Sequence, residues 1–248
     1  MQALSVNRRS ASPTSQARVL IAFGLLVESR LFHRTIRSLV MLAVPLWVLG
    51  SVAPARAADE ADFVKGEMAI HDGDHASAYR AWLPLARMGH TKSQYAVGAL
   101  LSEGRGVGRS YREAYAWWPR AAEQSHSGAQ YNIGMMLKAG LGVEADTAKA
   151  HDWLERAAHQ GNSDAQVALG RFHRTGCGVT QNLQEAFFWL EVARRGGRTA
   201  VSDELRSLES EIASYERLVA VERADEWLSR HGAESDTDRP PLAAVGSE

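Results

Sequence analysis

The apolar positions between residues 127 and 162 fall into two blocks with the spacing of amphipathic helices. The first block predicts a helix whose buried face carries Ala129, Ile133, Met136 and Leu137. The second predicts a helix over residues 147–160 that buries Ala150, Trp153, Leu154, Ala157 and Ala158. Gly140 can form a left-handed cap after the first helix, and Asp146 or Thr147 can cap the start of the second. This stretch is therefore predicted to form a helix–loop–helix hairpin.

The same pattern recurs along the chain with a period of 36 residues. Five kinds of position repeat three times without slippage: Gln94, Gln130 and Gln166; Gly98, Gly134 and Gly170; Gly106, Gly142 and Gly178; Trp117, Trp153 and Trp189; and Ala121, Ala157 and Ala193. A fixed period of this length indicates a stack of supersecondary units, because each unit must bury its apolar face on a neighbour. The sequence therefore predicts an all-α solenoid.

The repeated glycine and tryptophan positions suggest how the hairpins pack. A glycine inside a helix costs about 1 kcal/mol relative to alanine, so its recurrence at Gly134 and its equivalents predicts a close helix approach with no room for a Cβ atom. The recurring tryptophans could be interpreted as a ladder for stacking a ligand. Their strict spacing on the apolar face instead favours a role in the core.

Short motifs surround these positions in three consecutive units. The middle unit reads Ala129-Gln-Tyr-Asn-Ile-Gly134, Gly140-Leu-Gly-Val143, Ala148-Lys-Ala150, Trp153 and Arg156-Ala-Ala158. The unit before it has Ser93-Gln-Tyr-Ala-Val-Gly98, Gly104-Arg-Gly-Val107 and Arg120-Ala-Ala122, and the unit after it has Ala165-Gln-Val-Ala-Leu-Gly170 and Gly176-Cys-Gly-Val179. These motifs resemble the Sel1-like repeat, a tetratricopeptide-related family, over residues 93–197. The resemblance implies an α/α superhelical solenoid of helix–loop–helix repeats.

The repeats are flanked by segments with weaker patterns. Residues 58–92 are interpreted as a degenerate N-terminal repeat with a shortened loop, in which Trp82 and Ala86 stand at the repeated Trp and Ala positions. Residues 198–232 show helical spacing of apolar residues and are predicted to form capping helices. Residues 233–248 contain Pro240-Pro241 and many polar residues, and they are predicted to be disordered.

Residues 1–57 have the features of a targeting segment. Arg34 and Arg37 precede an apolar run over residues 38–52, and Ala55-Arg56-Ala57 follows it, which is the order of a cleavable signal peptide. We expect cleavage after Ala57 or Ala58 and a periplasmic or secreted protein with no stable membrane span. An uncleaved anchor is the alternative, although the run is shorter than the roughly 20 residues of a comfortable span. The long preceding stretch also suggests that translation starts downstream, near Val27 or Leu31.

Charge is distributed unevenly over the 248 residues. The chain has 28 basic and 29 acidic residues, of which residues 1–57 hold seven basic and one acidic. Subtraction leaves 21 basic and 28 acidic residues, a net charge of −7, for residues 58–248. Nucleic-acid binding needs a basic face, so this balance argues against it. The single cysteine, Cys177, rules out an intrachain disulfide, and an inert thiol is favoured over a reactive one.

Candidate catalytic and metal-binding residues are few. His71 and His75 have the spacing of two ligands on one helical face, but Gly73 predicts a turn between them. The Gly-x-Gly-Val segments join two helices and do not follow strands, so they do not fit a phosphate-binding loop. We therefore predict no catalytic residue, no cofactor and no metal site.

The resemblance implies a non-enzymatic scaffold that receives a protein or peptide segment. The segment is expected to lie along the first helices of the successive repeats, which together form one row. Positions on that row that vary between repeats are the candidate partner-binding residues: Ala99, Met135 and Arg171, then Ser102, Lys138 and Arg174. The three cationic members favour an acidic or polar partner. Exported proteins of this kind are similar to regulators of envelope signalling, exopolysaccharide production and cell-wall remodelling. A cell-wall hydrolase and a purely structural solenoid are the alternatives.

Overall fold

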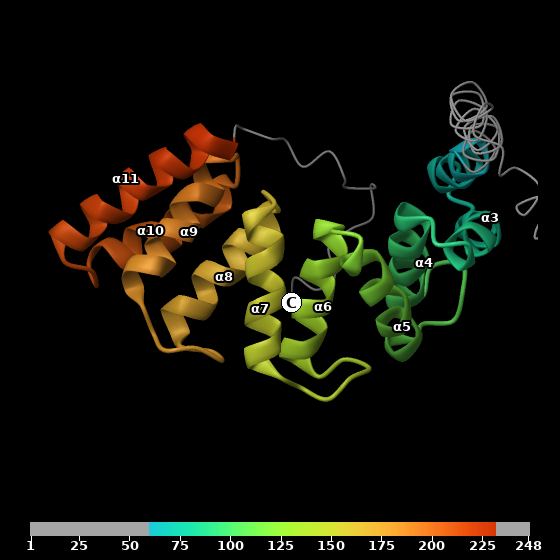
Figure 1. The fold of residues 1–248 in the computed structure, drawn as a ribbon, viewed down its shortest axis with the longest axis horizontal. Helices are drawn as coiled ribbons and strands as arrows, with labels where there is room; N and C mark the ends of the chain where they lie inside the picture. The colour runs from blue at the N-terminus through green and yellow to red at the C-terminus, as the bar shows by residue number, and fades with distance from the viewer. Residues whose placement is uncertain (1–59, 232–248) are drawn as a thin grey trace, which may run out of the picture. The chain divides into compact units, whose positions relative to one another are not determined.

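A computed structural model describes residues 60–231, and these residues form helices joined by short loops (Figure 1). Residues 60–71 are helical. The helices that follow are α3 (His75–Arg87), α4 (Thr91–Glu103), α5 (Tyr111–Glu123), α6 (Ser127–Ala139), α7 (Thr147–His159), α8 (Ser163–Thr175), α9 (Leu183–Arg195), the 3₁₀ helix η1 (Thr199–Val201), α10 (Ser202–Glu209) and α11 (Ser214–His231). The predicted targeting segment and C-terminal tail lie outside the described residues. Within residues 60–231, no helix is both long and apolar enough to cross a membrane.

The helices pack as hairpins, which confirms the predicted helix–loop–helix solenoid. The pairs α4–α5, α6–α7 and α8–α9 form the hairpins, and α5 packs on α6 as α7 does on α8. The predicted caps are present as well. Gly140 ends α6 in the left-handed conformation with φ 68°, and the Asp146 side chain accepts a hydrogen bond from the backbone N–H of Lys149.

The glycines inside the first helices allow the hairpins to close. A Cβ atom added to Gly134 would lie 2.7 Å from Cγ of Leu154, and one added to Gly170 would lie 2.7 Å from Cγ of Leu190. Gly98 faces the indole of Trp118 in the same way. The prediction of a close helix approach at these glycines is therefore confirmed.

The prediction for the tryptophan row is only partly correct. Trp189 is buried, but Trp117 and Trp153 are half-buried, and Arg120 and Arg156 each lie 4.8 Å over their rings. The fully buried positions lie one residue later along the helix: Trp82, Trp118, Leu154 and Leu190. Adjacent residues on a helix differ by about 100° in direction, and the later position is the one that points at the glycine.

The N-terminal hairpin follows the same design with a shorter loop. The indole Nε1–H of Trp82 donates to the backbone oxygen of Phe63 at 3.0 Å, as that of Trp118 does to Tyr95 at 3.1 Å. Trp82 precedes Trp118 by 36 residues, so it corresponds to the buried position. The sequence-based assignment of Trp82 to the Trp117 position was therefore wrong by one residue.

Buried glutamines join each hairpin to the one before it. Gln130 Nε2 donates to the backbone oxygen of Ala122 at 3.1 Å, and Gln130 Oε1 accepts from Gln160 Nε2 at 2.6 Å. Gln94 makes the equivalent contacts with Ala86 and Gln124. A buried carbonyl at a helix end needs such a partner. The recurrence of glutamine is therefore explained by packing between hairpins.

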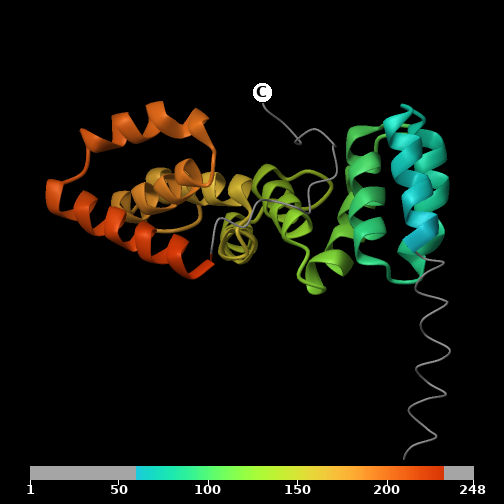
Figure 2. The ribbon, with the colours of Figure 1, turned by 90° about the horizontal axis from the view of Figure 1, so that it is seen from above.

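The segment after α9 forms a degenerate last unit. Val201, Leu205 and Leu208 are buried and lie 36 residues after Ala165, Leu169 and Phe172, so η1 and α10 stand where the next first helix would be. Its partner, α11, packs on α9, while α10 and α11 diverge from their connecting turn and share no extensive contact (Figure 2). Arg206 stands 36 residues after Gly170, so the last unit has no glycine at the position where the earlier first helices approach their partners.

Candidate functional site

The candidate partner-binding residues occupy different environments on the row of first helices. Ala99 and Ser102 on α4 are buried, and the Ser102 hydroxyl donates to the backbone oxygen of Ala99 at 2.9 Å. Met135 on α6 is half-buried against the core. Lys138 is exposed near the end of α6, with its Nζ 5.4 Å from the centroid of the Phe172 ring. Of these four residues, Lys138 is the one that presents a charged group to solvent.

Arg171 and Arg174 on α8 pair with acidic side chains of the last unit. Arg171 forms a two-pronged pair with Glu204 on α10, and hydrogen bonding to Glu204 raises the pKa of Arg171. Arg174 donates to Glu211 at 2.6 Å and to the hydroxyl of Ser207 at 3.0 Å. These two members of the row therefore already contact an acidic helical segment within the same chain.

A pair of histidines lies in one layer between repeats, and we call His151 and His173 the histidine pair. His151 is on α7, His173 is on α8, and their Nε2 atoms are 3.4 Å apart. The rings meet edge to face with centroids 5.1 Å apart. His173 is half-buried, and its Nδ1 atom is buried without a hydrogen-bond partner. Burial, assisted by His151, lowers the pKa of His173, so its neutral form is favoured.

A cavity of about 420 Å³ opens beside His173, bounded by α7, α8, α9 and α11. We call it the C-terminal cavity, and its lining is formed by Glu155, His159, His173, Glu185, Phe188, Trp189, Arg223, Glu226, Trp227 and Arg230. Two of its carboxylates are paired, since Glu185 lies 2.5 Å from Arg223 and Glu226 lies 2.7 Å from Arg230. The cavity thus combines aromatic walls with ion pairs and one half-buried histidine.

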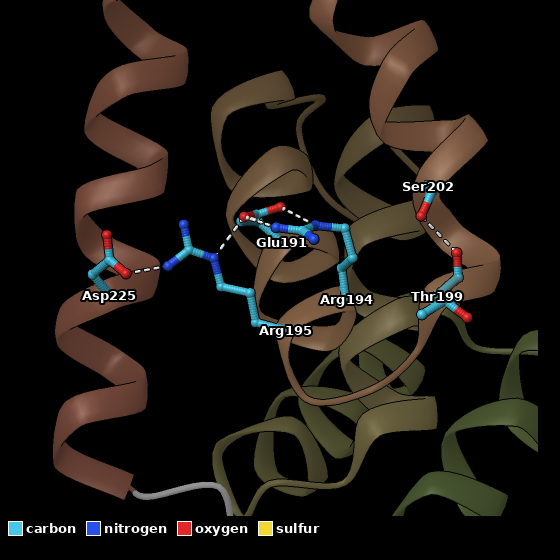
Figure 3. Close-up of polar contacts among 6 residues, drawn as sticks. All are labelled: Glu191, Arg194, Arg195, Thr199, Ser202 and Asp225. Carbon is cyan, nitrogen blue, oxygen red and sulfur yellow. Dashed lines mark hydrogen bonds and ion pairs between the residues drawn. The ribbon is translucent and has the colours of Figure 1, made fainter.

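An ion-pair network holds α11, and with it one wall of the cavity, against α9 (Figure 3). The buried carboxylate of Glu191 accepts from Arg194 at 2.6 and 2.8 Å and from Arg195 at 2.6 Å. Arg195 also pairs with Asp225 on α11. Burial of Glu191 acts to raise its pKa, but the arginine hydrogen bonds outweigh burial and the pKa is lowered.

The histidine pair and the cavity are the parts of this region that the sequence did not predict. His151 and His173 are 22 residues apart and belong to different hairpins, so no local motif joins them. The 36-residue register offered a signal, because the His173 position is Leu101 and Leu137 in the earlier repeats. Within residues 60–231, no group of three or more His, Cys, Asp or Glu side chains is arranged to hold a metal ion.

Comparison with known proteins agrees with this geometry. The Sel1 repeat family model matches residues 91–126, 127–162 and 163–197, and each matched unit begins with a first helix. Three consecutive units of the chain are therefore similar to the Sel1 repeat. The family matches begin two residues before the predicted boundary, where α4 starts.

The chain is also similar, to different degrees, to two solved structures. A Sel1 repeat protein from Oxalobacter formigenes is 27% identical, with 69% of this chain and 75% of that chain covered and a TM-score of 0.58. The protein c5321, a protective antigen present in uropathogenic Escherichia coli strains and displaying an SLR fold, is 22% identical with a TM-score of 0.48. That match covers 81% of this chain and 52% of the other, so it spans about half of the other protein. A comparison with curated proteins gave no match.

Proposed function

We propose that this protein is a non-enzymatic scaffold of the cell envelope that binds an acidic segment of a protein or peptide partner. Sel1 repeats typically serve as protein-interaction scaffolds, which supports the general role. The envelope location is supported by the order of basic, apolar and Ala-x-Ala segments in residues 1–57. Within the envelope, regulation of signalling, exopolysaccharide production or cell-wall remodelling is the proposed context.

The contact between α8 and α10 is the observation that supports an acidic partner. Arg174 binds Glu211 of the last unit, and Lys138 is its equivalent 36 residues earlier. At the position that corresponds to Glu211, the next helix offers Thr175, and Lys138 forms no ion pair within residues 60–231. A carboxylate from a partner would supply the negatively charged neighbour that Lys138 lacks.

A capture experiment with matched lysine variants tests this proposal. The wild type, Lys138→Ala and Lys149→Ala are used as bait in an envelope extract of the native host. Lys149 is a suitable control because it is exposed and lies on the second helix of the same hairpin. We expect a partner that is retained by the wild type and by Lys149→Ala and is at least tenfold depleted with Lys138→Ala. Equal retention by all three would place the binding face elsewhere.

The proposed location has a separate test. Mass spectrometry of the protein purified from its host should find a mature N-terminus at Ala58 or Asp59, since cleavage is expected after Ala57 or Ala58. A product that retains residues 34–57 would contradict a cleaved signal peptide and support an anchor.

Two of the three carboxylates that line the C-terminal cavity are poorly placed for the alternative of a cell-wall hydrolase. General acid–base catalysis needs a carboxyl or imidazole group free to exchange a proton with a substrate. Glu185 and Glu226 are instead held by Arg223 and Arg230. We therefore retain the scaffold as the proposed function.

A further inference from the structure

The histidine pair breaks a pattern that the other repeats share. The residues 36 and 72 positions before His151 are Tyr115 and Tyr79, and the residue 36 positions after it is Phe187. The equivalents of His173 in the earlier repeats, Leu101 and Leu137, are buried. Where the preceding repeats place Tyr115 and Leu137, the histidine pair therefore places two imidazoles.

Packing does not explain this exchange. If one imidazole donates to the other through Nε2, Nδ1 of His173 still stays buried without a partner. An unpaired buried polar atom is unfavourable, and a hydrogen bond of this kind adds little net stability. A leucine at the same position would avoid both problems, as it does at Leu137. The two histidines therefore require a reason other than stability.

We propose that His151 and His173 bind a divalent transition-metal ion, with Zn²⁺ as the best fit. Imidazole nitrogens coordinate zinc at about 2.0–2.1 Å in tetrahedral geometry, which places two ligand nitrogens roughly 3.3–3.4 Å apart. The two Nε2 atoms are 3.4 Å apart, which is the separation that one tetrahedral ion bonded to both would need. This assignment revises the sequence-based expectation that the chain has no metal site.

The surroundings of the pair suit a metal ion. His173 lines the C-terminal cavity together with Glu155 and Glu185. Glu155 and Glu185 exert a favourable Coulomb effect on positive charge at His173.

The coordination is completed by water, because the protein offers two ligands in this arrangement. A site with two protein ligands keeps open positions, unlike a closed structural zinc site with four. We therefore expect binding that a chelator reverses. Neutral imidazole is the form that coordinates the ion, so binding should weaken at acidic pH.

Zn²⁺ titration by isothermal calorimetry of the whole purified protein, after chelator treatment, tests this site. The key variant combines His151→Phe and His173→Leu, which restores the residues found at Phe187 and Leu137 and so preserves the packing of the layer. His71→Ala is the matched control, because His71 is an exposed histidine on another hairpin. His159→Ala is a second control, because His159 lines the cavity but is not part of the pair.

We expect one Zn²⁺ per chain in the wild type and in both control variants, and at least a tenfold loss of affinity in the double variant. Saturating Zn²⁺ should raise the Tm of the wild type and leave that of the double variant unchanged, because an ion that binds only the folded state stabilises it. Equal binding by the double variant, loss of binding through His159→Ala alone, or no binding to the wild type would each overturn the proposal. Circular dichroism of the double variant confirms that it is folded before the comparison is made.

Discussion

Replacement of Gly134 by alanine should destabilise the protein, although the same change stabilises most helices. In an exposed helix, Gly→Ala gains about 1 kcal/mol. Here the new Cβ would lie 2.7 Å from Cγ and 3.0 Å from Cδ2 of Leu154, and 3.1 Å from the backbone oxygen of Ala150. Contacts this short require movement of a fully buried side chain and of backbone, because Leu154 has 0% exposure.

The magnitude follows from two opposing effects. Overpacking of a well-filled core costs roughly 1–3 kcal/mol, and the gain in helix propensity offsets about 1 kcal/mol of this. Gly134→Ala should therefore lower the free energy of unfolding by about 1 kcal/mol. In a Leu154→Ala background the two contacts with the leucine side chain are absent and the contact with the Ala150 backbone oxygen remains, so the same change should be neutral or stabilising by up to about 1 kcal/mol. The coupling between the two sites should then be about 1–2 kcal/mol, within the range for residues in contact.

A double-mutant cycle in urea measures this coupling. The four proteins are unfolded with circular dichroism and tryptophan fluorescence as probes, and agreement between the probes justifies the two-state treatment. Leu154→Ala alone should cost about 2–5 kcal/mol, so the comparison relies on the difference between the two glycine backgrounds. If Gly134→Ala stabilised the protein with Leu154 present, the close approach would not be what requires glycine.

Three further outcomes are expected. Gln130→Ala should lower the free energy of unfolding by about 1–3 kcal/mol in the same urea assay, because the Ala122 carbonyl loses its partner in the core. The exposed control Gln181→Ala should change this free energy by less than about 0.5 kcal/mol. Because the pKa of Glu191 is lowered in the folded state, Glu191 should stabilise the protein above the ordinary carboxyl pKa of about 4.3, and this stability should be lost as the pH falls through the lowered pKa. Glu191→Gln should therefore make the free energy of unfolding depend less on pH below about 4.3. Arg174→Ala should lower the free energy of unfolding by at most about 1 kcal/mol, since the pair with Glu211 is partly exposed. It should nevertheless speed amide hydrogen exchange in α10 and leave exchange in α6 unchanged. The same exchange rate in α10 of the variant and the wild type would show that the apolar contacts of α10 are enough to hold it.

The hairpins could be predicted because their boundaries depend on local chemistry. Gly140 and Asp146 mark a helix end and a helix start through backbone conformation and side-chain capping, and both act within a few residues. The identity of the innermost aromatic position could not be predicted in the same way. Trp117 and Trp118 are adjacent, and only the position of the facing glycine on another helix decides which one is buried.

The last unit escaped recognition because the residues that mark a repeat are missing from it. Arg206 stands at the glycine position and Asp225 at the tryptophan position. The apolar residues Leu205 and Leu208 nevertheless keep the 36-residue register and bury themselves as their equivalents do. Apolar register alone is a weak signal, since many residue types satisfy it. The structure supplied the missing facts, which are that side chains of α8 contact α10 and that α11 lies apart from α10 (Figure 2).

Residues that mark the repeat and residues that carry a specific function should be different sets in a solenoid. The buried glutamines and the glycines inside the first helices make contacts that every hairpin needs. They therefore recur in each repeat and carry no information about a partner. Function is then to be sought where a unit departs from the others. Arg206 is one such departure, and it occurs in the unit whose two helices, α10 and α11, lie apart. The histidine pair is another, and neither packing nor capping explains it, which is why His151 and His173 are the residues at which a specific ligand should first be tested.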